Sequence, residues 1–155
     1  MGRAAGIQDR AGAPVRRNAW MWRCAMLVRD YMTRQVITLS QETEILNALM
    51  VLAEYDISGA PVLDARGRVV GMLTEKDCLR SALEATYHSE YGGLVSDYMS
   101  SEVAFVDPDD GVVKVAERFV AHSYHRYPVL EDGMLVGIIS RRDVIQALAG
   151  AWQWK

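Results

Sequence analysis

A hydroxyl side chain is followed three residues later by a carboxylate at two places in the chain, each directly after a short apolar run. The pairs are Thr74 with Asp77 and Ser140 with Asp143. This spacing fits a capping box, in which both side chains satisfy N–H groups at the start of a helix. The same turn favours an anionic ligand group, and a carboxylate there can accept two hydrogen bonds from a ribose diol. Both interpretations, a structural cap and a ligand site, are open.

Cationic side chains gather near the second pair. Arg141 and Arg142 follow Ser140, and His125 and Arg126 stand shortly before it; the corresponding residues of the first half are the uncharged Ser58, Gly59 and Ala60, with only Lys76 and Arg80 near Thr74. Because the planar guanidinium fork of Arg matches phosphate oxygens, the pattern predicts that the second site is the better phosphate site. The alternative is that these Arg side chains point into solvent.

The chain repeats itself. Residues 28–32 return as 95–99, residues 61–63 as 128–130, and residues 71–77 as 137–143. The first two offsets are 67 residues and the third is 66, so one residue is missing from the turn around 66–68 in the second copy. A repeat that cannot close its own core must bury it against its twin, so the functional site is expected between the copies.

Each copy is predicted to run strand, helix, strand, strand, helix. Short strands are expected at 36–39 and 103–106, followed by helix starts at Ser40 and at Asp107. A helical apolar face repeats at the offset of 67: Ile45, Ala48, Leu49 and Leu52, then Val112, Val115, Ala116 and Phe119. Hairpins turn at 65–68 and 131–133, and second helices run from Glu75 to about 84 and from Arg141 to about 149. The pattern predicts a pseudo-twofold α+β module, with two sheets packed face to face and two symmetry-related clefts.

With these residues in view, the chain resembles a tandem CBS-domain pair, also called a Bateman module, of the stand-alone bacterial type. The motifs that carry the resemblance are residues 30–33 and 97–100, 59–62 and 126–129, and 71–77 and 137–143. The expected division is a leader at 1–26, repeats at 27–84 and 95–150 joined by a linker at 85–94, and a tail at 151–155. The resemblance implies two βαββα repeats packed sheet to sheet. It also implies an adenosine-containing ligand in each, such as AMP, ADP, ATP, NAD or S-adenosylmethionine, with no metal required.

Residues 125–129 are similar to the His-Arg-apolar-Pro-Val strings of the γ subunit of AMP-activated protein kinase, where the His and Arg face phosphate. The residues expected to contact ligand are Thr74, Asp77, Ser140, Asp143, Arg141, Arg142, His125, Arg126, Tyr127, Pro128, Ser58, Gly59, Ala60, Pro61, Lys76, Val36, Thr38 and Val103. The family usually pairs two modules, and apolar helix residues suit a symmetric contact: Cys78, Leu79, Ala82, Leu83, Val144, Ile145, Leu148 and Ala149. We therefore expect a homodimer.

Composition restricts the class of protein. The 155 residues are 50% hydrophobic, as in a globular domain, and no apolar run reaches the length of a membrane span. The two cysteines, Cys24 and Cys78, make no disulfide framework and suit a reducing cytoplasm. Residues 1–35 carry seven Arg and two Asp, whereas the remainder carries ten basic and eighteen acidic residues. An acidic repeat pair argues against nucleic-acid binding. The Trp residues at 20, 22, 152 and 154 lie outside the repeats and fit a packed cap or an oligomer contact.

The sequence contains no Walker A loop, dinucleotide fingerprint, nucleophile elbow or zinc-protease string, so we do not expect an enzyme. His122 and His125 stand three residues apart without further metal ligands in the pattern, and Cys78 lies on an apolar helix face, as a core residue would. The leading hypothesis is a noncatalytic nucleotide sensor read by an unidentified effector protein. The alternative is a ligand-free interaction or assembly module.

Overall fold

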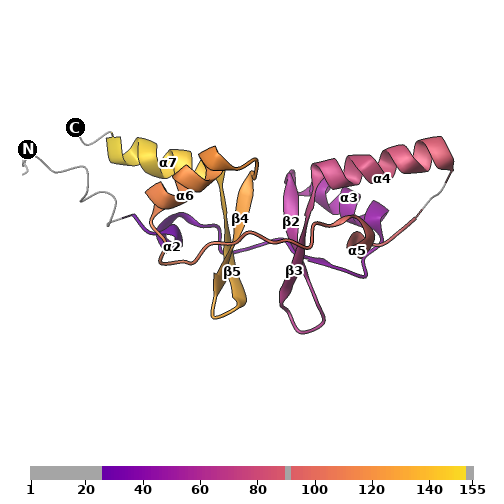
Figure 1. The fold of residues 1–155 in the computed structure, drawn as a ribbon, viewed down its shortest axis with the longest axis horizontal. Helices are drawn as coiled ribbons and strands as arrows, with labels where there is room; N and C mark the ends of the chain where they lie inside the picture. The colour runs from indigo at the N-terminus through magenta and orange to yellow at the C-terminus, as the bar shows by residue number, and fades with distance from the viewer. Residues whose placement is uncertain (1–25, 90–91, 153–155) are drawn as a thin grey trace, which may run out of the picture.

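The computed structural model describes residues 26–89 and 92–152 of the chain. The first half consists of β1 (Leu39–Ser40), α3 (Ile45–Glu54), β2 (Gly59–Leu63), β3 (Val69–Thr74) and α4 (Glu75–His88). The second half consists of α6 (Val112–Ala121), β4 (Arg126–Glu131), β5 (Met134–Ser140) and α7 (Arg141–Trp152). One-turn helices, α2 (Val28–Tyr31) and α5 (Val95–Tyr98), precede the halves in sequence. The strands lie at the centre of the molecule and the helices at its outer ends (Figure 1). The α+β arrangement of two halves meeting through their sheets is as predicted.

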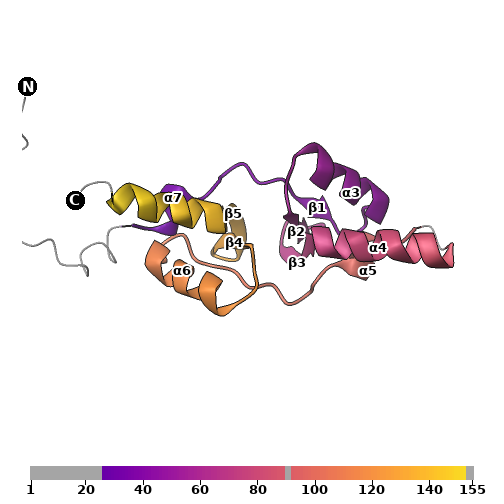
Figure 2. The same cartoon turned by 90° about the horizontal axis from the view of Figure 1, so that it is seen from above.

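The two sheets are small. In the first half, β1 pairs in parallel with β2, with Leu39 opposite Val62, and β2 pairs antiparallel with β3. In the second half, β4 pairs antiparallel with β5, and Val106 makes a single parallel bridge to Val129 where a counterpart of β1 would stand. The strands predicted at 36–39 and 103–106 are thus reduced to Leu39–Ser40 and one bridge. The chain before them instead runs across from one half to the other, as the crossing segments 33–38 and 100–105 (Figure 2).

The one-turn helices are exchanged between the halves. The Val28 N–H donates to the Asp110 carbonyl at 2.9 Å, and Thr33 and Ile138 exchange backbone hydrogen bonds of 2.9 Å each. In the same way, the Val95 N–H donates to the Thr43 carbonyl at 2.8 Å. Hence α2, which begins the first repeat, packs on the second half, and α5 packs on the first half (Figure 1).

A glycine in β3 and one in β5 permit this approach. A Cβ atom on Gly137 would lie 2.6 Å from Met32 Sδ and 3.0 Å from the Thr33 carbonyl oxygen. A Cβ atom on Gly71 would lie 2.5 Å from Met99 Sδ. The repeated motifs 71–77 and 137–143, which begin with these glycines, therefore hold the exchanged segments as well as leading into α4 and α7.

Two hydrophobic cores result. The first contains Leu39, Ile45, Ala48, Leu52, Ala60, Val62, Leu73, Cys78 and Val95. The second contains Met26, Val28, Met32, Val106, Val112, Val115, Phe119, Tyr127, Val129, Ile139, Val144 and Ala147. The predicted helical faces are confirmed, with Leu49 and Ala116 partly buried at their edges.

Helix boundaries differ from the prediction. The helices α3 and α6 begin at Ile45 and Val112, several residues after Ser40 and Asp107. Those two residues form turns instead: the Ser40 carbonyl accepts from the Thr43 N–H, and Asp107 Oδ1 accepts from the Asp109 N–H at 2.8 Å. The second helices start where predicted but continue to His88 and Trp152, into the segments expected to be linker and tail.

The predictions for residues 1–25, including Cys24, Trp20 and Trp22, and for Trp154 lie outside the described residues. Within residues 26–89 and 92–152, every helix is too short or too polar to cross a membrane.

Candidate functional site

Both predicted capping turns are formed. Asp77 Oδ2 accepts from the Thr74 N–H and from the Thr74 hydroxyl, each at 3.0 Å. Asp143 Oδ2 accepts from the Ser140 N–H at 2.8 Å and from the Ser140 hydroxyl at 2.9 Å. In each turn these bonds fall on one of the two carboxylate oxygens and fix the side chain at the helix start. A ligand could bind to the other oxygen, so the capping role and the ligand-binding role are compatible.

Two clefts adjoin these turns. Cleft 1, of about 490 Å³, is lined by Ser58, Met72, Thr74, Glu75, Lys76, Ser100, Glu102, Ala104, Ser123, Tyr124, His125 and Arg126. Cleft 2, of about 190 Å³, is lined by Thr33, Gln35, Val36, Ile37, Ile57, Gly59, Arg126, Ile138, Ser140 and Asp143. Arg126 belongs to both walls. Ligand pockets are commonly 300–1,000 Å³, so cleft 1 is large enough for a nucleoside and cleft 2 is tighter.

The clefts are two copies of one site. Ser140 in cleft 2 corresponds to Thr74 in cleft 1 at the offset of 66, and Ile57 corresponds to Tyr124 at the offset of 67. The other equivalent pairs are Thr33 with Ser100, Gln35 with Glu102, Ile37 with Ala104, Gly59 with Arg126, and Ile138 with Met72. Each cleft takes its capping turn from one half and a loop from the opposite half, because the halves face each other.

Because each cleft combines residues of both halves, the basic side chains are distributed between the clefts differently from the prediction. His125, expected beside Ser140, accepts from the Arg141 N–H at 3.1 Å through its carbonyl and also lines cleft 1 with Thr74 and Lys76. Arg141 donates from Nε to the Tyr124 carbonyl at 2.8 Å and lies outside the walls described for cleft 2. Arg142 is exposed and also lies outside those walls. Of the four basic residues predicted beside Ser140, Arg126 is the one in the described wall of cleft 2, and the preference of phosphate for that cleft stays a prediction.

Arg126 is half-buried between the clefts. Its Nη1 donates to the Gly59 carbonyl at 3.2 Å, and its Nη2 donates to the Ser58 hydroxyl. Its Nε is buried and has no hydrogen-bond partner among the described residues. Burial lowers the pKa of the Arg126 guanidinium, while the carboxylates of Glu75 and Asp143 act in the opposite direction. The side chain is thus a partly desolvated cation near acidic groups of both clefts.

Several predicted site residues lie behind the clefts. Tyr127 and Ala60 are fully buried in the cores on the helix side of their strands, and the Tyr127 ring packs on Phe119 with centroids 4.7 Å apart. Pro61 and Pro128 are buried within the strands. Asp77, Thr38 and Val103 are outside the cleft walls described here, and Arg80 donates to the Tyr98 carbonyl at 3.1 Å. The cleft residues Thr33, Gln35, Ile37, Ser100, Glu102 and Ala104 were missed, although their place just after each repeated 28–32 motif was a usable signal.

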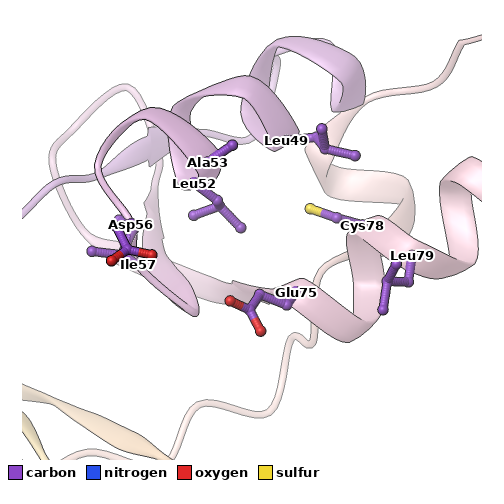
Figure 3. A pocket seen from close by; sticks show the side chains of 8 residues that line it. All are labelled: Leu49, Leu52, Ala53, Asp56, Ile57, Glu75, Cys78 and Leu79. Carbon is purple, nitrogen blue, oxygen red and sulfur yellow. The ribbon is translucent and has the colours of Figure 1, made fainter.

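A third cavity, of about 370 Å³, lies between α3 and α4, on the helix side of the first half (Figure 3). Its walls are mainly apolar, with Glu75 and Asp56 at the edge. Burial raises the pKa of the Cys78 thiol, and the nearby carboxylates of Asp77 and Glu75 add to the effect. A thiol that resists ionisation is a poor nucleophile, in keeping with a core role for Cys78.

Among the described residues, no group of three or more His, Cys, Asp or Glu side chains is placed to hold a metal ion.

The fold and these clefts define a pair of α+β units related by a pseudo-twofold axis, with one cleft for each capping turn. The family model of the CBS domain matches residues 28–84 and 95–150, and the chain belongs to this family.

Relatives agree with this assignment. The CBS domain-containing protein YhcV of Bacillus subtilis is 30% identical over 118 residues, which cover 76% of this chain and 81% of YhcV. MJ1225 of Methanocaldococcus jannaschii is 30% identical over 125 residues, 81% of this chain, but the match spans only 44% of that longer protein. The structure is similar to CBSX2, whose Arabidopsis thaliana form has been crystallised and whose complex with AMP is known. The AMP complex superposes with a TM-score of 0.73 at 27% identity, covering 83% of this chain and 99% of that one.

Proposed function

We propose that this protein is a noncatalytic regulatory module that binds an adenosine-containing nucleotide, such as AMP, ADP, ATP, NAD or S-adenosylmethionine, in clefts 1 and 2. The observation that carries the proposal is the pair of equivalent clefts, each adjoining a hydroxyl–carboxylate turn at a helix start. The AMP complex of the similar CBSX2 supports this ligand class.

The chemistry of the walls suits the parts of such a ligand. A carboxylate at a helix start can accept hydrogen bonds from ribose hydroxyls, as Asp143 would in cleft 2. Cationic groups at the junction of the halves, Arg126 together with Lys76 and His125 in cleft 1, suit phosphate. Apolar residues of the crossing segments, such as Val36 and Ile37, suit the base. Since both clefts combine residues of the two halves, a bound ligand would favour one relative placement of the halves. An effector protein in the cytoplasm would read that change.

Thermal unfolding with a ligand panel tests the proposal. At 100 times its dissociation constant, a ligand adds about 2.7 kcal/mol of stability, which corresponds to a rise in Tm of roughly 5–10 °C at this chain length. We expect one or more of AMP, ADP, ATP, NAD and S-adenosylmethionine to produce such a rise, whereas GMP and inorganic phosphate at the same concentrations should not. A flat response to the whole adenosine series would contradict the proposal.

A second candidate is a ligand-free assembly module. The closed capping boxes favour it, because Thr74, Asp77, Ser140 and Asp143 already satisfy one another without a ligand. Native mass spectrometry of protein purified from its own cells separates the two candidates, since a retained nucleotide would exclude the second.

We further propose a homodimer formed through the outer helices. Of the predicted contact residues, Cys78 and Val144 face the cores, and Ala82 and Leu148 are half-buried. Leu79, Leu83 and Ile145 are 63%, 53% and 65% exposed, and Ala149 is also exposed. Leu46 and Met50 on α3 are also exposed, at 43% and 64%. Exposed apolar side chains in this number are characteristic of a protein interface.

Sedimentation velocity at micromolar concentration should give the mass of a dimer. Leu79→Glu combined with Leu83→Glu should shift the protein to monomer, since it places charge in the contact. The matched control is Val120→Glu on α6, which changes a residue that is 90% exposed. A monomeric wild-type protein, with and without AMP, would contradict the proposal.

A further inference from the structure

Arg126 joins the two clefts through its contacts. Its Nη2 donates to Ser58, which lines cleft 1, and its Nη1 donates to the carbonyl of Gly59, which lines cleft 2. The two carboxylates that act on it electrostatically are likewise divided, with Glu75 in the wall of cleft 1 and Asp143 in the wall of cleft 2. A single guanidinium is therefore held on the boundary between two otherwise equivalent sites.

The hydrogen bonding of this guanidinium is incomplete. The buried Nε has no partner within the described parts of the chain, and a buried donor without a partner carries a free-energy cost. A phosphate oxygen reaching the boundary from either cleft would meet a donor that is already desolvated. Charge-assisted hydrogen bonds from Arg to phosphate are stronger than the bonds to neutral oxygens that Arg126 makes now.

The clefts depend on Arg126 to different extents. Among the residues described in its wall, cleft 2 has Arg126 as its one cationic side chain, next to the carboxylate of Asp143. Cleft 1 has Lys76 and His125 as well, together with Glu75 and Glu102. If a phosphate in cleft 1 draws Arg126 toward itself, a second phosphate in cleft 2 faces Asp143 without a compensating cation.

Resting on the proposed function, we propose that Arg126 is a phosphate-binding residue shared by both clefts, so that an anionic nucleotide in one cleft weakens the binding of an anionic nucleotide in the other. The coupling is reciprocal, as linkage requires, and couplings of this kind amount to about 5- to 150-fold in affinity. Adenosine, which has no phosphate, binds the two clefts independently. The protein would thus respond to the charge of its ligands and not only to their base.

The test uses a matched pair of blocking variants. Ile37 of cleft 2 and Ala104 of cleft 1 are equivalent and half-buried, so Ile37→Trp and Ala104→Trp each fill one cleft and leave the other open. Calorimetry on each variant gives the affinity of the single open cleft for AMP. If the clefts were independent, the product of the two stepwise association constants of the wild-type protein would equal the product of these two single-cleft constants.

We expect the wild-type product for AMP to be lower than the single-cleft product by about 5- to 150-fold. With adenosine the two products should agree within error, and Arg126→Ala or, if that variant unfolds, Arg126→Lys should abolish or reduce the difference for AMP. Equal products for AMP in the wild-type background would overturn the shared role of Arg126 but leave the proposed function standing. A wild-type protein that binds neither AMP nor adenosine would overturn both.

Discussion

Replacing Asp143 with alanine is expected to weaken AMP binding in cleft 2 by roughly 10- to 100-fold. A hydrogen bond between a carboxylate and a ribose hydroxyl contributes on the order of 1.5–3 kcal/mol, which corresponds to that range. The variant also loses the bonds from the Ser140 N–H and hydroxyl, which should lower the free energy of unfolding by about 1 kcal/mol. Calorimetry in the Ala104→Trp background reports on cleft 2 alone, and denaturant unfolding gives the stability.

Asp97 provides the matched control. Its Oδ2 accepts from the Leu94 N–H at 2.8 Å at the start of α5, and it lies outside the walls described for both clefts. Asp97→Ala should therefore lower stability by a similar amount and leave AMP affinity unchanged. If Asp143→Ala behaved in the same way as Asp97→Ala, the carboxylate of Asp143 would be only a helix cap, as in the assembly-module candidate.

A second large effect is expected from Gly137→Ala. The added methyl group would lie 2.6 Å from Met32 Sδ and 3.0 Å from the Thr33 carbonyl oxygen, beside the backbone bonds that hold the exchanged segment on β5. The Met32 side chain can move, but the backbone oxygen can do so only by weakening those bonds. Overpacking of this kind costs about 1–3 kcal/mol, which a lower midpoint of urea unfolding would measure.

Gly150 on α7 offers the control, because a Cβ atom there would meet nothing within 4 Å. Gly150→Ala should leave stability unchanged or raise it by up to about 1 kcal/mol, through the better helix propensity of alanine. If Gly137→Ala were as stable as Gly150→Ala, the exchanged segment would not be held tightly against β5.

The sequence predicted those elements that have a strong local signal. The apolar spacing around Ile45 and Val112 located the helices, since only one helical face can be buried. The predicted first residues of these helices were wrong, because Ser and Asp stabilise a turn as readily as a helix cap. In the structure Ser40 and Asp107 make turns. The sequence alone does not decide between a turn and a helix cap, because the choice depends on how the following residues pack.

The residues of the candidate site could be predicted from the sequence, but which of them share a cleft could not. The capping pairs, His125, Arg126 and Lys76 were all identified from residue type and position in the repeat. Residues of the same repeat were then assumed to share a cleft, which placed His125 with Ser140. In the folded protein the loop before β4 contacts the start of α7, where the Arg141 N–H donates to the His125 carbonyl at 3.1 Å, but the halves face each other, so the same loop also lines cleft 1 with the capping turn of α4. This choice depends on how the two sheets meet, which no local pattern encodes.

The exchange of α2 and α5 also bears on how the chain can fold as it is synthesised. The first core includes Val95, so it is still incomplete when residue 84, where the first family match ends, has been made. The second core includes Val28, which must stay unpaired until Val106 and the strands after it follow. Contacts between residues so distant in sequence slow folding, because a long loop must close before they form. A cut between α4 and α5 would accordingly give two fragments that each carry part of the other's core.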